Sequence, residues 1–145
     1  MKYFTLSEFL NSSTAIKYNI SNVPDAKTIA NITDLVNGLL DPLREAWTIY
    51  CNSKGYSKSG IIVSSGYRCP ALNSKVGGAK TSAHLTGNAA DLIPANGKIK
   101  EFILFTQDWI KTKAFDQCIN EYGKWCHVGY KNNSGLQRRQ IFKIS

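Results

Sequence analysis

The spacing of apolar residues changes along this chain of 145 residues, and the change limits the folds that it can adopt. As far as Cys51 the apolar positions recur every three or four residues, which is the period of an amphipathic helix. From Ile61 onward, short apolar or alternating runs typical of strands become frequent. Helices first and strands later predict the α+β class, with N-terminal helices packed on a small, mostly antiparallel sheet.

The helical part carries recognisable end signals. Thr5 and Glu8 have the spacing of a capping box, so we expect a first helix over residues 7–14. A longer apolar stripe follows and is interrupted at Asp41 and Pro42, which favours either a kink or a new helix capped by Asp41. The stripe consists of Ile29, Ile32, Leu35, Val36, Leu39 and Leu40, and then Leu43, Ala46, Trp47, Tyr50 and Cys51.

The later part of the chain alternates between short strand patterns and turn signals. Tyr122, Gly123 and Lys124 form a plausible turn between two apolar runs, which predicts a hairpin. We expect strands over residues 61–63, 89–93, 115–121, 125–130 and 138–144, and helices over 71–76 and 99–110.

The length suits one domain, residues 1–145, with a helical lead-in over 1–60 and a region over 61–145 that carries the candidate site. An apolar content of 43% supports a packed core and argues against disorder. No run approaches the roughly 20 apolar residues that a membrane-spanning helix needs. The N-terminus reaches Glu8 before any apolar run, so we expect synthesis in the cytoplasm without a signal peptide.

The chain is basic, with 18 Lys and Arg against 10 Asp and Glu and a net charge of +8. Such a charge favours an anionic partner, either nucleic acid or another polyanion such as a bacterial cell wall. The basic residues are spread along the chain, and only Arg138 and Arg139 form a tight pair. No nucleic-acid-binding motif is visible, so we expect no nucleic-acid partner.

Four cysteines invite a zinc or a disulfide interpretation: Cys51, Cys69, Cys118 and Cys126. No two of them have the Cys-x-x-Cys spacing of a structural zinc site. We therefore predict free, buried thiols.

His84, Asp91 and His127 are candidate ligands of one metal ion. His84 lies in a loop and Asp91 seven residues later in a predicted strand, so the two can converge. Strand alternation places His127 on the face opposite Cys126. Two imidazoles and one carboxylate form a three-ligand zinc set with a fourth position for water, although a His and an Asp at this spacing also occur by chance.

Several motifs in order carry a resemblance to a known family. They are Ser65-Gly66-Tyr67-Arg68, Asn73, Val76-Gly77-Gly78-Ala79, Ser82-x-His84-x-x-Gly87-x-Ala89-x-Asp91, Phe115-Asp116-Gln117, Glu121 and Trp125-x-His127-Val128, with Asn22-Val23-Pro24 and Leu40-Asp41-Pro42-Leu43-Arg44 upstream. Together they resemble the M15 family of zinc peptidases, in particular the D-Ala-D-Ala carboxypeptidase-like domains and phage endolysins. The resemblance covers most of the chain and implies a fold like that of these peptidases and the hedgehog signalling domain.

The resemblance implies roles for individual residues. It makes His84, Asp91 and His127 ligands of one Zn²⁺ per chain, and Arg68 the residue that pairs with a substrate carboxylate or carbonyl. A guanidinium suits that role because it can donate two parallel hydrogen bonds to a carboxylate. An ordinary surface arginine beside the next helix is the alternative for Arg68.

The general base departs from the family pattern. Several relatives carry an acid three positions before the last histidine, where this chain has Lys124. Glu121 is the best substitute, because a turn over residues 122–124 makes it face the strand of His127. Asp116 is the reserve candidate for a catalytic role and can equally be a structural hydrogen-bond acceptor.

Two further residues are candidates for substrate binding. Ser82 can hydrogen-bond near the site or support the loop of His84. Trp125 shares a strand face with His127 and can wall the cleft, or it can be an ordinary core aromatic.

The resemblance implies a zinc-dependent peptidase that cuts peptidoglycan stem peptides, as a carboxypeptidase or an endopeptidase. We expect a monomer that acts on the bacterial cell wall, as a phage lysis enzyme, a virion component or a bacterial enzyme, without a membrane partner. The alternative is a non-catalytic zinc-containing module that binds cell wall or protein.

Overall fold

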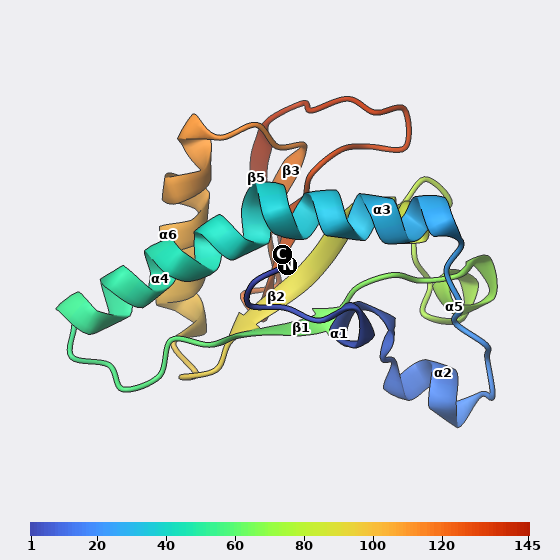
Figure 1. The fold of residues 1–145 in the computed structure, drawn as a ribbon, viewed down its shortest axis with the longest axis horizontal. Helices are drawn as coiled ribbons and strands as arrows, with labels where there is room; N and C mark the ends of the chain where they lie inside the picture. Colours follow the sequence, from blue (N-terminus) through green and yellow to red (C-terminus); the bar gives the residue numbers. More distant parts are fainter.

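In the computed structural model, which describes all of residues 1–145, the helices and strands follow the predicted order (Figure 1). The α-helices are α1 (Leu6–Leu10), α2 (Ser13–Lys17), α3 (Ala26–Leu35), α4 (Asp41–Ser53), α5 (Pro70–Lys75) and α6 (Ile99–Trp109). The strands are β1 (Ile61–Ser65), β2 (Ala89–Pro94), β3 (Gln117–Glu121), β4 (Trp125–Gly129) and β5 (Gln140–Ile144). A π-helical segment, η1 (Val36–Leu40), and two 3₁₀ turns, η2 (Ala83–Thr86) and η3 (Ile110–Thr112), complete the set. The predicted α+β class is confirmed.

The predicted single helix over residues 7–14 is wrong, because the chain forms two short helices there. Thr5 and Glu8 do start α1, where the backbone N–H of Thr5 donates to the Glu8 carboxylate at 2.6 Å. Asn11 is extended, and the hydroxyl of Ser12 accepts the backbone N–H of Ala15 at 3.1 Å. A new N-cap at Ser12 therefore begins α2.

At Pro42 a π-helical segment joins α3 and α4 into one continuous helix, which changes direction at the junction (Figure 1). Proline has no N–H for the carbonyl four residues earlier, and its ring clashes with that carbonyl in a regular helix. A wider turn before Pro42 relieves this conflict. Asp41 does not cap α4; its carboxylate accepts the backbone N–H groups of Lys2 and Tyr3 at 2.6 and 3.0 Å and anchors the N-terminus.

The five strands form one sheet in the order β1-β2-β4-β3-β5. The pairs β1–β2, β2–β4 and β3–β4 are antiparallel, whereas β3 and β5 are parallel. The sheet is therefore mostly antiparallel, as predicted. Strands β1 and β5 are its two edges, and the predicted hairpin lies at the centre of the arrangement as β3 and β4.

One hydrophobic core joins the helices of the first 60 residues to the sheet. Alternate residues of the central strands, among them Leu92, Cys126 and Val128, point into this core and are fully buried. The opposite face of the same strands is free to carry polar side chains. No helix is both long enough and apolar enough to cross a bilayer.

Replacing Trp47 by Ala tests the junction between α4 and α6. The Trp47 ring is fully buried and contacts Tyr50, Phe102 and Phe105 at centroid distances of 5.2, 5.1 and 5.4 Å. Trp47→Ala should lower the free energy of unfolding by about 3–5 kcal/mol in urea titrations, because it leaves a large cavity. On the same helix, Ile49 is 71% exposed, so Ile49→Ala is the control and should change it by less than about 0.5 kcal/mol. Equal losses would contradict this account of the core.

Candidate metal centre

Asp91 and His127 face each other across the pairing of β2 with β4. The antiparallel register makes them direct partners, and both side chains point away from the helix-packed core. Directly opposed residues on one face of a sheet have their Cβ atoms about 5 Å apart, so their side chains meet. The His127 Nδ1 atom lies 3.0 Å from Asp91 Oδ1, and both residues are buried.

His84 reaches the same carboxylate oxygen from the η2 turn. The Ser82 hydroxyl accepts the backbone N–H of His84 at 3.2 Å and so caps this turn. The His84 Nδ1 atom lies 2.7 Å from the carbonyl oxygen of Gly66, which can only accept, so Nδ1 carries the proton. The lone pair of Nε2 is then directed at the site, 3.2 Å from Asp91 Oδ1.

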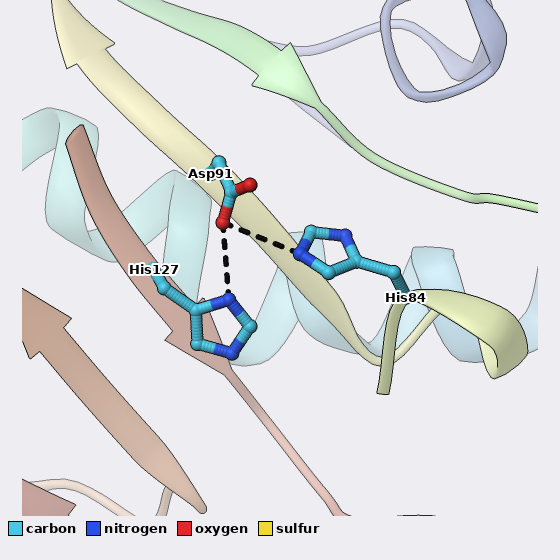
Figure 2. Close-up of side chains that lie close together, drawn as sticks. All are labelled: His84, Asp91 and His127. Atoms are coloured by element: carbon cyan, nitrogen blue, oxygen red, sulfur yellow. Dashed lines mark hydrogen bonds and ion pairs between the residues drawn. The ribbon is translucent and has the colours of Figure 1, made fainter. Parts of the chain in front are cut away.

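The three side chains converge on one point from three different elements (Figure 2). Their donor atoms, one from each of His84, Asp91 and His127, all lie within 4.8 Å of one another. Four-coordinate zinc with bonds of about 2.0–2.1 Å separates its ligand atoms by roughly 3.3 Å, so the set fits zinc without large movement. Burial alone would raise the pKa of Asp91, but His84 and His127 outweigh it and hold that pKa below its usual range.

The four cysteines take no part in the cluster. All are free and buried, as predicted. Cys126 points into the core, where its Sγ lies 3.7 Å from Sγ of Cys118. The Cys118 thiol and burial together raise the pKa of Cys126, which keeps it protonated and unsuited to bind a metal.

Glu121 lies beside the cluster at the end of β3. Tyr122 and Gly123 adopt positive φ angles of 59° and 66° and turn the chain, so that Glu121 pairs with Trp125 at the start of β4. Glu121 Oε1 is 3.7 Å from His127 Nδ1, and its side chain is 20% exposed. Burial raises the pKa of Glu121, and the Asp91 carboxylate raises it further. His127, His84 and the Trp125 indole partly offset this rise in pKa, and no lysine or arginine forms an ion pair with the carboxylate. Lys124 itself is exposed in the turn.

Arg68 is held by its backbone and leaves its guanidinium unpaired. Asn22 clamps the residues on either side: its side chain donates to the carbonyl of Tyr67 at 2.9 Å and accepts the N–H of Cys69 at 2.8 Å. The Arg68 N–H donates to the carbonyl of His84 at 3.0 Å. Its Nε is buried without a partner, and no carboxylate forms an ion pair with it. Burial lowers the pKa of Arg68, but a guanidinium remains charged at neutral pH.

Asp116 lies outside this cluster. Its side chain is 1% exposed and forms a two-point ion pair with Arg138: Nε to Oδ1 at 2.7 Å and Nη2 to Oδ2 at 2.8 Å. The backbone N–H of Arg138 also donates to Asp116 Oδ1 at 3.1 Å. Of the two roles open to Asp116, the contacts match the structural acceptor.

A cavity of about 590 Å³ opens over the metal cluster. Arg68, Ser82, Glu121 and Trp125 all line it, so four of the sequence-predicted site residues surround the three ligands. Trp125 is half-buried, packs edge-on against Tyr122, and keeps its indole N–H buried without a partner.

Several residues that line the cavity were not assigned a site role from the sequence, among them Gln117, Ile119 and Arg138. Gln117 and Ile119 alternate with Glu121 along β3, and this spacing was the signal for them.

Removal of single ligands tests the metal assignment. Protein purified without added metal should contain one zinc per chain by elemental analysis, and His84→Ala should contain close to none, because two donors hold zinc poorly. Cys126→Ala is the matched control and should keep its zinc, since Cys126 faces the core. Loss of zinc from Cys126→Ala with the fold intact would contradict the strand-face assignment.

Comparison with known proteins agrees with the site. A search of curated proteins found no significant match to the chain. The family model for Peptidase M15 matches residues 2–129, which is nearly the whole chain and includes all three candidate ligands. M15 proteins are metallopeptidases that typically depend on zinc, and the donor set of His84, Asp91 and His127 fits that requirement. The chain therefore belongs to the M15 peptidase family.

Proposed function

We propose that this protein is a zinc-dependent peptidase that hydrolyses the stem peptides of bacterial peptidoglycan. The observation that carries the proposal is the combination, in one open cavity, of a three-donor metal cluster, the Glu121 carboxylate beside it, and an Arg68 guanidinium that forms no ion pair. These are the groups that hydrolysis of a peptide bond next to an anion requires.

His84, Asp91 and His127 would hold the zinc. When bound, zinc polarises the scissile carbonyl and lowers the pKa of the attacking water. Glu121 accepts the proton of that water and returns it to the leaving amine. Its position 3.7 Å from His127 and its raised pKa support this role, because a good base at neutral pH must also be able to give its proton back. Asp116 is occupied by Arg138, which favours Glu121 as the base.

Arg68 would bind an anionic group of the substrate. A half-buried guanidinium without a counter-ion gains most from a carboxylate, because the pair forms away from bulk water. Stem peptides carry several carboxylates, including the terminal one. A net charge of +8 would retain the enzyme on an anionic cell wall, where a phage lysis enzyme, a virion component or a bacterial enzyme would act.

Digestion of purified peptidoglycan, followed by mass analysis of the released fragments, tests the function. Release of D-Ala alone would identify a carboxypeptidase, and release of peptide pieces an endopeptidase. A zinc-loaded protein that cuts no peptidoglycan type but binds it would instead be the non-catalytic module, an alternative that rests on Lys124 at the usual position of the acid.

Glu121→Gln tests the assignment of the base. The amide is nearly the same size as the carboxylate and cannot accept a proton, so kcat should fall by about 10²–10⁴-fold while zinc content and fold are retained. Glu45→Gln is a matched control, because Glu45 lies far from the cavity in an exposed pair with Lys2. A Glu121→Gln enzyme with near wild-type kcat would rule Glu121 out as the base.

A further inference from the structure

A second arginine, Arg138, lines the cavity and comes from the opposite edge of the sheet to Arg68. Arg68 follows β1 and Arg138 precedes β5, and these strands are the two opposite edges of the sheet. The strands that carry Asp91 and His127 lie between them. Both arginines line the same cavity, so the cluster is flanked by a guanidinium on either side. Arg138 also lies beyond the part of the chain that the family model matches.

Arg138 is fixed in one orientation and keeps donors free. Its Nε and Nη2 atoms bind the two oxygens of buried Asp116. A guanidinium has five N–H groups. Two are used here, which leaves both N–H groups of Nη1 and one of Nη2 without a partner. The side chain is 41% exposed, although its partner is almost fully buried. A planar group held along one edge in this way presents its other edge to the cavity.

We propose that Arg138 is a second substrate-binding residue, which donates hydrogen bonds to a carboxylate of the peptide on the side of the metal cluster opposite Arg68. Asp116 is then a positioning residue, which acts by orienting Arg138. This inference rests on the proposed peptidase function and deepens it. It identifies the substrate class as peptides that carry a carboxylate on each side of the bond that is cut.

Arg68 and Arg138 are expected to bind a carboxylate in different ways, because their surroundings differ. Arg68 forms no ion pair, and its Nε is buried without a hydrogen-bond partner, so its guanidinium can bind an anion directly. The charge of Arg138 is partly balanced by Asp116, which also fixes the orientation of the guanidinium. Arg138 therefore helps to orient the bound carboxylate as well as to attract it. A peptide with only one carboxylate would leave Arg138 without its ligand, and such a peptide should bind more weakly.

The test compares stem peptides in which each carboxylate is converted to an amide in turn. The enzyme variant is the double change Asp116→Asn and Arg138→Gln, which removes the guanidinium without leaving a buried carboxylate unpaired. For the fully acidic peptide, KM should rise about 10- to 100-fold with kcat little changed, as expected for loss of hydrogen bonds to a charged group. For the peptide that lacks the carboxylate bound by Arg138, the double variant and wild type should have the same KM. For the peptide that lacks the carboxylate bound by Arg68, Arg68→Gln and wild type should have the same KM.

Arg139→Gln is the matched control. Arg139 is the neighbouring arginine, but its guanidinium donates to the backbone carbonyls of Lys111 and Lys113 and does not line the cavity. It should leave KM unchanged for every peptide. If the double variant unfolds more easily, Arg138→Lys keeps the charge beside Asp116 but lacks the free donor edge, and it should show the same dependence on amidation.

Equal losses for acidic and amidated peptides, or no loss at all, would overturn the role of Arg138 while the peptidase proposal stands. A wild-type enzyme that cuts no stem peptide would remove the proposed function. In that case the role of Arg138 is tested by calorimetry, which measures the affinity of the same peptides for wild type and for the variants. Unchanged affinity in the variants, or no binding by wild type, overturns its role.

Discussion

The antiparallel pairing of β2 with β4 is the constraint on which the whole site depends. It sets Asp91 directly opposite His127, so that two of the three candidate ligands meet without any help from loops. Because strand side chains alternate between faces, a shift of one residue would turn one of the two into the core. The third ligand, His84, is then oriented by a hydrogen bond from its Nδ1 to Gly66, just beyond the end of β1. Three neighbouring segments thus position the three candidate ligands around one point.

The same alternation divides the sheet into a packing face and a chemical face. Cys118, Cys126 and Val128 point to the helices and are fully buried, which anchors the central strands in the core. Their neighbours in sequence point to the cavity, among them Ile119 and His127. Every apolar contact that stabilises β3 and β4 on the helix side therefore also holds the site residues in register on the other side. Rigid strands are better supports for such a site than loops are.

The charged side chains around the cavity differ in how closely they contact groups of opposite charge, and these differences indicate their roles. Asp91 is surrounded by two imidazoles and keeps its pKa low, as a metal ligand requires. Glu121 shares the same surroundings but lacks such close partners, so burial raises its pKa. Arg68 forms no ion pair and keeps its Nε without a hydrogen-bond partner, whereas Arg138 is bound at two points by Asp116. Glu121 and Arg68, which form no close ion pair with an oppositely charged arginine, lysine or carboxylate, both line the cavity, where a substrate can bind them.

The features that depend on residues close together in the chain could be predicted before the fold was known. Helical and strand periods gave the α+β class, a turn after Glu121 predicted the hairpin, and family motifs identified His84, Asp91 and His127. These signals are local, so they survive without knowledge of the fold. Contacts between distant segments became visible only in the folded chain. The parallel pairing of β5 with β3 and the capture of Asp116 by Arg138 join residues more than 20 positions apart. Periodicity and turn chemistry carry no information on such contacts, because they arise only when distant segments pack against one core.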